Sequence, residues 1–231
     1  MEYEVVRVKP QKQKERLNIY FSSGQYLGLS AFVFGQSSLA IGSKIDTKEI
    51  FKLIQKDFFE RGKSKSLNFL SYRPRSSSEV KERLSKYFFK ISGESKSDSI
   101  LSIFPKEKIK TCAEIVCDQT LDWLKEKNFV NDYEFANWWI NLRISGKPTS
   151  KKMIYYELRK KGIDKSILDE IIKDIDFNEV EVARKLYLKR ISRPSYEPTI
   201  KNKQKIIRWL AGKGFSYDVI KRVIDEEDKV K

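Results

Sequence analysis

Basic side chains gather in three segments of the chain, and few acidic residues interrupt them. Residues 143–161 contain seven Lys or Arg and one acid, Glu157, while residues 200–213 contain five basic residues and no acid. Residues 73–90 contain six basic residues and two acids. Clustered positive charge binds a polyanion, either the phosphates of a nucleic acid or the carboxylates of an acidic protein surface. The side chains that we expect to make these contacts are Arg73, Arg75, Arg143, Lys147, Lys151, Lys152, Arg159, Lys160, Lys161, Lys201, Lys205 and Arg208.

The chain offers no set of side chains that would catalyse a reaction. It has no histidine, which excludes Ser–His and Cys–His nucleophile pairs and a Cys/His zinc site. Residues 212–214 read Gly-Lys-Gly but lack the leading glycine and the preceding strand of a phosphate-binding loop. The acids within residues 169–176 follow the pattern of a solvated helix face. We therefore predict no catalytic residue, no cofactor and no metal ligand, and a protein that is not an enzyme.

The net charge of the whole chain favours the same class of partner. Lys and Arg number 47 against 32 Asp and Glu, which gives a formal charge of +15. Such a surplus favours nucleic acid, although an acidic protein surface, an anionic lipid surface or a gain in solubility alone would also account for it. Because Lys dominates and acts as a point charge, we expect contacts to the phosphate backbone rather than readout of base sequence.

The sequence carries no sign of export or of membrane insertion. Residues 1–8 include acidic residues and form no apolar core of a signal peptide. No stretch reaches the roughly 18 apolar residues of a membrane span. Cys112 and Cys117 are five residues apart in a helical pattern and so point to different faces, which favours free, partly buried thiols over a redox pair. Together these features predict a cytoplasmic protein in a reducing compartment, without a membrane partner.

Helices must position the basic segments, because helix signals recur throughout the chain beyond residue 61. Ser76 and Glu79 have the spacing of an N-terminal capping pair. Gly162 and Gly214 each follow a run of helix-forming residues, where a glycine commonly ends a helix. The expected helices cover residues 106–127, 132–143, 150–161, 165–173, 178–190, 201–213 and 217–227.

The first part of the chain follows a different pattern. Residues 16–21 and 26–29 are apolar runs on either side of a turn that contains Gly24, which is typical of a β-hairpin. Asp46, with a glutamate three residues later, then has the spacing of a capping box before an apolar helix face. We expect residues 1–60 to form a small N-terminal module of a β-hairpin and a helix.

The helical part of the chain repeats itself. Residues 156–164 and 208–216 both read as a helix end, a leucine, a short middle stretch, a glycine, an apolar residue and a cap. An earlier copy begins at residues 76–84. We predict a mostly α-helical fold of tandem three-helix, helix-turn-helix-like repeats in an elongated, curved array. Its predicted parts are the N-terminal module at 1–60, a first repeat at 61–130 with an insertion around 88–110, a second repeat at 131–176 and a third at 177–231.

The second helix of each predicted repeat is the basic one. If the repeats also recur in space, these helices would form a single stripe that can follow a phosphate backbone or the acidic groove of a filament. Three independently solvated helices are the alternative. Charge reversal at Lys151 and Lys152 is expected to weaken binding to the polyanion and to flatten its salt dependence.

Several segments resemble the RecX family. Residues 70–76, Leu-Ser-Tyr-Arg-Pro-Arg-Ser, resemble the opening of the first RecX repeat, and residues 131–136, Asn-Asp-Tyr-Glu-Phe-Ala, resemble that of the second. Residues 156–163 resemble the end of the second repeat, residues 213–216 the third, and residues 16–20 the hairpin of longer members. The order and spacing of these segments over nearly the whole chain carry the resemblance.

The resemblance implies a modulator of the RecA recombinase. RecX-like proteins bind in the helical groove of the RecA filament on single-stranded DNA, block its ATPase and strand exchange, and limit filament growth. The implied partners of this monomer are therefore RecA, single-stranded DNA and double-stranded DNA, in recombination, DNA repair and the SOS response. Two alternatives remain open: a stand-alone basic DNA-binding protein of helix-turn-helix-like units, and a regulator that docks on an acidic protein surface without touching DNA.

Overall fold

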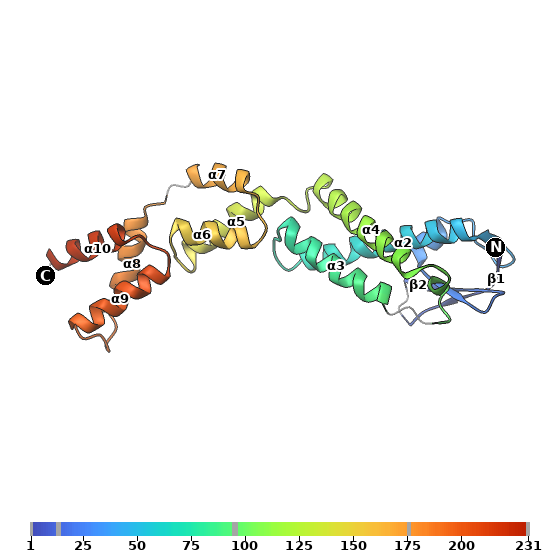
Figure 1. The fold of residues 1–231 in the computed structure, drawn as a ribbon, viewed down its shortest axis with the longest axis horizontal. Helices are drawn as coiled ribbons and strands as arrows, with labels where there is room; N and C mark the ends of the chain where they lie inside the picture. The colour runs from blue at the N-terminus through green and yellow to red at the C-terminus, as the bar shows by residue number, and fades with distance from the viewer. Residues whose placement is uncertain (1, 13–14, 94–96, 175–176, 230–231) are drawn as a thin grey trace. The chain divides into compact units, whose positions relative to one another are not determined.

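The chain folds into two units, and each is described by itself. The computed structural model describes residues 2–12, 15–93, 97–174 and 177–229. The first unit comprises Met1–Val130 and the second Asn131–Lys231. Helices dominate both units, and the strands of the described residues all lie in the first (Figure 1). The predicted mostly α-helical class with a small N-terminal strand module is confirmed, whereas the elongated, curved array stays a prediction.

A four-stranded antiparallel sheet opens the first unit. Gly24, with a φ of +83°, forms the tight turn of the predicted hairpin, in which Tyr20 lies opposite Tyr26. The three-residue strand Lys44–Asp46 at the edge of the sheet was not predicted, because so short a segment shows no alternating pattern. The strands are β1 (Glu2–Pro10), β2 (Arg16–Phe21), β3 (Tyr26–Ser30) and β4 (Lys44–Asp46), in the order β3-β2-β1-β4.

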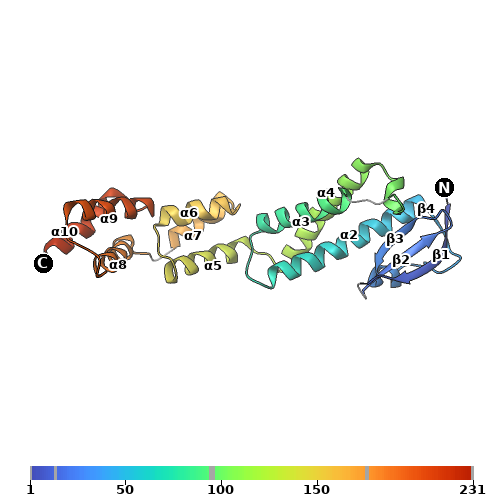
Figure 2. The same cartoon turned by 90° about the horizontal axis from the view of Figure 1, so that it is seen from below.

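Three long helices complete the first unit: α2 (Thr47–Leu70), α3 (Ser77–Gly93) and α4 (Lys106–Glu126), after the short α1 (Ala31–Gly35). The predicted capping box begins α2, where the Asp46 carboxylate accepts the Glu49 backbone N–H at 2.7 Å and the Glu49 carboxylate accepts that of Asp46 at 3.3 Å. Figure 2 shows the sheet beside the N-terminal part of α2. Gly62 permits a close approach of α4, because a Cβ there would lie 2.6 Å from Thr120 Oγ1.

One apolar core joins the sheet to these helices. It includes Val5 and Leu29 from the sheet, Ile54 from α2 and Leu124 from α4. The predicted boundary after residue 60 falls inside α2, which continues to Leu70. The described part of the predicted insertion packs on the same core, because Ile100 of the 3₁₀ helix η1 (Ile100–Ile103) is fully buried there.

The second unit contains two three-helix repeats. The predicted helices are confirmed to within two residues at each end, and the predicted glycines Gly162 and Gly214 end the second helices with φ of +79° and +87°. Each repeat has its own core, built around Leu158 in the second repeat and Leu210 in the third. The helices are α5 (Asp132–Ser145), α6 (Lys151–Lys160) and α7 (Lys165–Asp174), then α8 (Glu179–Ile191), α9 (Ile200–Gly212) and α10 (Tyr217–Lys229).

Candidate functional site

The second helix of the second repeat, α6, presents an exposed basic face. Ser150 caps the helix, and Ile154 and Leu158 are buried in the core of the repeat. Residues three, four and eight apart share one side of a helix, so the side chains away from the core form a continuous surface. That surface consists of Lys152, Tyr156, Arg159 and Lys160, all of them exposed.

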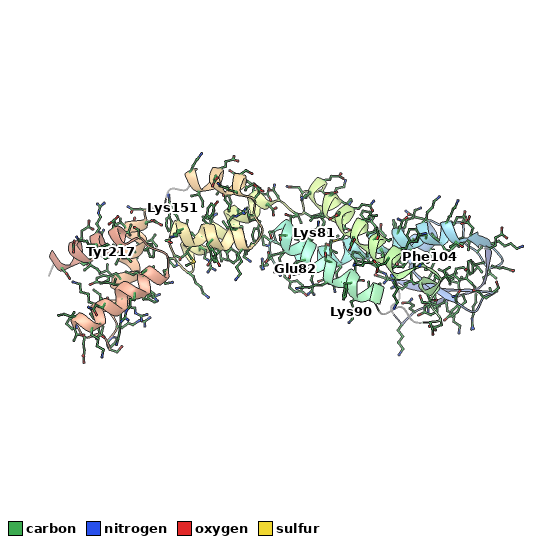
Figure 3. All side chains as sticks on the ribbon, viewed as in Figure 1. Lys81, Glu82, Lys90, Phe104, Lys151 and Tyr217 are labelled. Carbon is green, nitrogen blue, oxygen red and sulfur yellow. The ribbon has the colours of Figure 1, made fainter. Side chains whose placement is uncertain are left out.

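The start of α6 is held by the third repeat. The Lys213 carbonyl accepts hydrogen bonds from Thr149 Oγ1 at 2.8 Å and from the Ser150 backbone N–H at 3.2 Å. The Lys151 backbone N–H donates to Glu179 Oε1 at 2.7 Å. These contacts fix the first turn of α6, which begins at Lys151 (labelled in Figure 3). The Lys151 side chain is half-buried, so Lys152 is the more accessible of the two predicted lysines.

Other predicted cations of the second repeat have partners within it. Arg143 Nε lies 2.7 Å from Glu157 Oε2, and the same oxygen accepts the Trp139 indole N–H at 2.9 Å. The Arg143 guanidinium lies 4.8 Å and Lys161 Nζ 4.3 Å from the centroid of the Trp139 ring. The Trp139 indole is half-buried and contacts both cations. Lys147, in contrast, is exposed.

The second helix of the third repeat, α9, presents a similar surface. Ile206 and Leu210 face the core of the repeat, while the predicted residues Lys201, Lys205 and Arg208 are exposed at helical spacing. Lys205 Nζ is 3.3 Å from Asn202 Oδ1 of the same helix, a contact that leaves its charge uncompensated. Both repeats of the second unit therefore carry an exposed basic face on the second helix.

The first unit places its predicted cations differently. Arg73 donates two hydrogen bonds to the Glu79 carboxylate, at 2.8 and 3.3 Å, and the Arg75 guanidinium lies 4.0 Å from the centre of the Phe69 ring. Burial, together with the nearby charge of Arg73, lowers the pKa of Arg75. Both arginines belong to the turn between α2 and α3 rather than to a helix face.

Two of the cations of α3 itself are matched by acids. Lys81 Nζ is 2.6 Å from Asp118 Oδ1, and this hydrogen bond raises the pKa of Lys81. Lys86 pairs with Glu82 at 2.5 Å (Figure 3 labels Lys81, Glu82 and Lys90 along the helix). The helix is basic in sequence, yet its surface carries less uncompensated charge than α6 or α9. The stripe across all three repeats stays a prediction.

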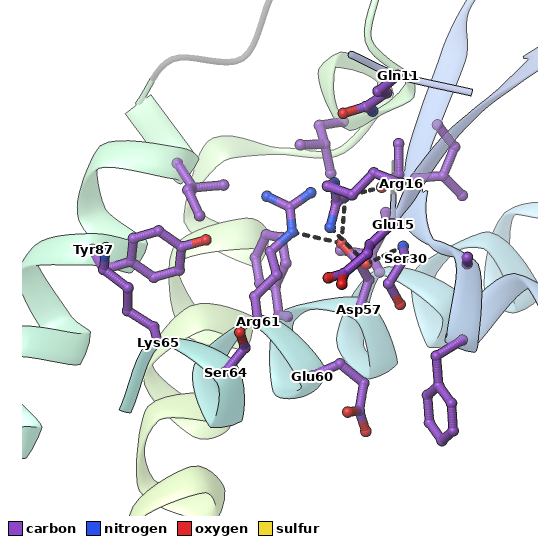
Figure 4. A pocket seen from close by; sticks show the side chains of 18 of the residues that line it. Gln11, Glu15, Arg16, Ser30, Asp57, Glu60, Arg61, Ser64, Lys65 and Tyr87 are labelled. Atoms are coloured by element: carbon purple, nitrogen blue, oxygen red, sulfur yellow. Dashed lines mark hydrogen bonds and ion pairs between the residues drawn. The ribbon is translucent and has the colours of Figure 1, made fainter. Parts of the chain in front are cut away.

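A cavity of about 1200 Å³ in the first unit was not predicted. Asp57 lies at its base, where Arg16 donates to both carboxylate oxygens at 3.0 and 3.2 Å and the Ser30 backbone N–H donates at 2.7 Å (Figure 4). Arg61 Nε lies 2.7 Å from Asp57 Oδ2, an ion pair without hydrogen-bond geometry. Two arginines thus match one buried carboxylate, and the network ties the hairpin to α2.

The described residues provide no chemistry of another kind. No group of three or more His, Cys, Asp or Glu side chains among them is placed to hold a metal ion. Cys112 and Cys117 are free, as predicted, and both are fully rather than partly buried. Burial raises the pKa of the Cys112 thiol to about 11. The usable chemistry of the described surface is positive charge on helix faces.

Two half-buried cations were not among the predicted contact residues, although Lys213 was counted in the basic segment 200–213. Arg190 on α8 and Lys213 at the end of α9 lie over the Trp209 ring, with 4.8 and 5.2 Å to its centroid. A comparison of the repeats residue by residue would have found them, because they occupy the positions of Arg143 and Lys161 in the second repeat.

Family models match the two repeats of the second unit. The second three-helix domain of RecX matches residues 131–172, and the third three-helix domain of RecX matches residues 178–224. These matched regions begin at α5 and α8, respectively, so the helices described above are those of the family's repeats.

Similar proteins and structures extend the likeness to nearly the whole chain. The regulatory protein RecX of Clostridioides difficile (strain 630) is 28% identical over 224 residues, which cover 96% of this chain and 94% of that protein. That of Bacillus subtilis (strain 168) is 26% identical, with 96% of this chain and 76% of the other covered.

Two crystal structures share the fold. One of regulatory protein RecX has a TM-score of 0.62 and 26% identity, and covers 96% of this chain and 99% of the other. The structure of RecX from Lactobacillus salivarius has a TM-score of 0.54 and 26% identity. The match covers 75% of this chain and 98% of the other. The matches to its second and third repeats, and to nearly its whole length, support the assignment of the chain to the RecX family of regulatory proteins.

Proposed function

We propose that the chain regulates the RecA recombinase by binding in the groove of the filament that RecA forms on single-stranded DNA. The expected consequence is a lower rate of ATP hydrolysis and strand exchange and limited filament growth. The observation that carries the proposal is the exposed basic face on both α6 and α9, within repeats of the RecX type. The protein acts as a binding partner and not as an enzyme.

The tandem repeats supply the physical basis of this binding. A helix face with three or four cations binds a polyanion weakly, and each contact is screened by salt. Once one face is bound, the next face on the same chain is held at a high effective concentration near the filament. A chain with several such faces therefore binds an extended acidic lattice more strongly than its single helices would.

The test is the ATPase of RecA on single-stranded DNA, measured while this protein is titrated. A parallel titration with the same DNA and no RecA gives the concentration at which the protein coats DNA by itself. Inhibition well below that concentration supports recognition of the filament. Inhibition only at saturation of the DNA, or none, contradicts the proposal and leaves a basic protein that binds DNA alone.

A further inference from the structure

The second and third repeats can be compared residue by residue. Asn131 and Asn178 cap the first helices, and Ala136 and Ala183 are the fully buried alanines five residues later. In the second helices the buried leucines correspond, as do the glycines that follow them with positive φ. With this correspondence, Arg143 pairs with Arg190 and Lys161 with Lys213.

In both repeats these two cations contact one indole ring. Arg143 and Lys161 lie 4.8 and 4.3 Å from the centroid of Trp139. Arg190 and Lys213 lie 4.8 and 5.2 Å from the centroid of the third repeat's indole. We call the second group, Arg190, Trp209 and Lys213, the Trp209 site, and the first group the Trp139 site. The indole attracts each cation and restricts it to a place beside the ring.

The two indoles come from different helices. Trp139 lies on α5, the first helix of its repeat, whereas Trp209 lies on α9, the second helix. The residue of the second repeat that corresponds to Trp209 is Glu157, and the residue of the third that corresponds to Trp139 is Leu186. The pair of cations over an indole therefore recurs although the sequence positions of the ring do not.

The Trp139 site shows which ligand its arginine and its indole N–H bind. The Glu157 carboxylate accepts from Arg143 Nε at 2.7 Å and from the indole N–H at 2.9 Å, so an oxyanion of the chain itself occupies the site. At the Trp209 site the corresponding acid is replaced by the tryptophan. Within the described residues neither Arg190 nor Lys213 forms an ion pair, although both side chains are only half-buried.

We infer that the Trp209 site binds a phosphate group of single-stranded DNA, and that Glu157 keeps the Trp139 site closed to phosphate. A phosphodiester offers an oxyanion to the arginine fork and a full charge to the lysine. The exposed Lys201, Lys205 and Arg208 belong to the same helix as Trp209 and can contact further phosphates of one strand. The inference rests on the proposed function for one point: that function makes single-stranded DNA, rather than an acidic protein, the partner of the third repeat.

The test measures binding of the full chain to a fluorescently labelled oligothymidylate by anisotropy, without a recombinase, at several salt concentrations. The double variant Arg190→Gln/Lys213→Gln is expected to bind roughly tenfold more weakly and to reduce the slope of log affinity against log salt by about 1. Glu157→Gln, which can still accept the Trp139 N–H, is expected to raise the affinity severalfold because a competing anion is removed.

Lys185→Gln/Lys221→Gln is the matched control, since both lysines are exposed, on α8 and α10 of the same repeat. It removes the same charge and is expected to bind within about twofold of the parent chain. Arg190→Lys keeps the charge over the indole and loses the fork. An intermediate affinity supports the inference even if the double variant fails to fold by circular dichroism.

Equal binding by the double variant and its control overturns the inference. The inference is also overturned if the double variant loses affinity for polyglutamate, a model of an acidic protein surface, but not for oligothymidylate. The site would then bind an acidic protein surface. The RecA titration of the proposed function is independent of these results. If the chain does not inhibit RecA but the Arg190 and Lys213 substitutions still weaken its binding to DNA, the inference about the Trp209 site is supported and the proposed function is contradicted.

Discussion

Arg16 on β2 and Asp57 on α2 form a two-point ion pair that connects the hairpin to the helices of the first unit. The two side chains are 41 residues apart in sequence, and the Asp57 side chain is only 2% exposed. A buried carboxylate is stable only when its charge and its hydrogen bonds are matched, and here two arginines and the Ser30 N–H match it. The Asp57 network thus adds a polar attachment of the hairpin to the apolar core that the sheet and the helices share.

Asp57→Asn is expected to destabilise the first unit by about 3–5 kcal/mol, because two arginines are then left without their buried counter-charge. Hydrogen exchange by mass spectrometry would show the loss as faster exchange in β2 and the first half of α2. Glu82→Gln is the control, since Glu82 and its partner Lys86 are both exposed and the pair contributes about 1 kcal/mol or less. Equal effects of the two substitutions would contradict the assigned role of Asp57.

Gly214→Ala tests the contact between the second and third repeats. The backbone there has a φ of +87°, which costs an L-residue about 1–2 kcal/mol, and a Cβ would lie 2.4 Å from Ser150 Oγ. We expect a loss of at least 2 kcal/mol in denaturant unfolding of the second unit, and faster exchange at the start of α6.

Gly212→Ala provides the matched control two residues away. That glycine is helical and a Cβ there would meet nothing within 4 Å, so alanine is expected to be neutral or to stabilise by about 0.5–1 kcal/mol. A Gly214→Ala chain as stable as the Gly212→Ala chain would show that the close approach is not needed.

Local signals in the sequence predicted the helices of the second unit well. Gly162 and Gly214 mark the ends of two helices because a positive φ strongly favours glycine, and that preference is visible without any tertiary context. Asp46 and Glu49 likewise predicted the start of α2 without tertiary context, because both hydrogen bonds of a capping box form within four residues. Elements defined by such local contacts need no knowledge of the rest of the fold.

The candidate site was harder to predict because charge compensation is a tertiary property. Arg143 and Arg73 read as available cations, yet Glu157 lies 14 residues from the first, and Glu79 pairs with the second across the α2–α3 turn. Lys81 is matched by Asp118 of another helix, which no spacing rule reveals. Arg190 was missed because the tryptophan beneath it lies on a different helix in each repeat.

The buried thiols give a prediction about reactivity. Burial raises the pKa of Cys112 to about 11, so at pH 8 only about one thiol in a thousand is the reactive thiolate. The pKa of Cys117 is also raised, chiefly by burial. Iodoacetamide at pH 8 is expected to leave both residues unmodified in the folded chain and to modify both in denaturant, as read by mass spectrometry. Rapid modification of folded protein would show that α4 opens readily.

The raised pKa also sets the sign of a stability change with pH. The thiol of the unfolded chain ionises near its ordinary pKa of about 9, while the folded thiol holds its proton to about pH 11. The contribution of Cys112 is therefore fully present below pH 9 and is lost as the pH rises towards 11. Cys112→Ala should remove this part of the alkaline loss, and an unchanged pH profile of unfolding would contradict it.

The exposed face of α6 gives the most direct test of filament binding. Lys152 and Lys160 are both exposed and eight residues apart on one side of the helix, whereas Lys151 is half-buried beside the contact with Glu179. Lys152→Glu/Lys160→Glu is expected to weaken binding to the RecA filament by roughly tenfold or more at low salt. It should also flatten the salt dependence, because each lost phosphate contact lowers the slope by about 0.7–1.

Lys165→Glu/Lys173→Glu on α7 is the control for this change. It alters the net charge by the same amount on the acidic third helix of the same repeat, where both lysines are exposed. If binding depends only on the overall charge of the chain, the two double variants will lose affinity equally, and the α6 face then has no special role. If the face contacts the filament, the control will retain most of its affinity at every salt concentration, since its charges lie away from the bound surface.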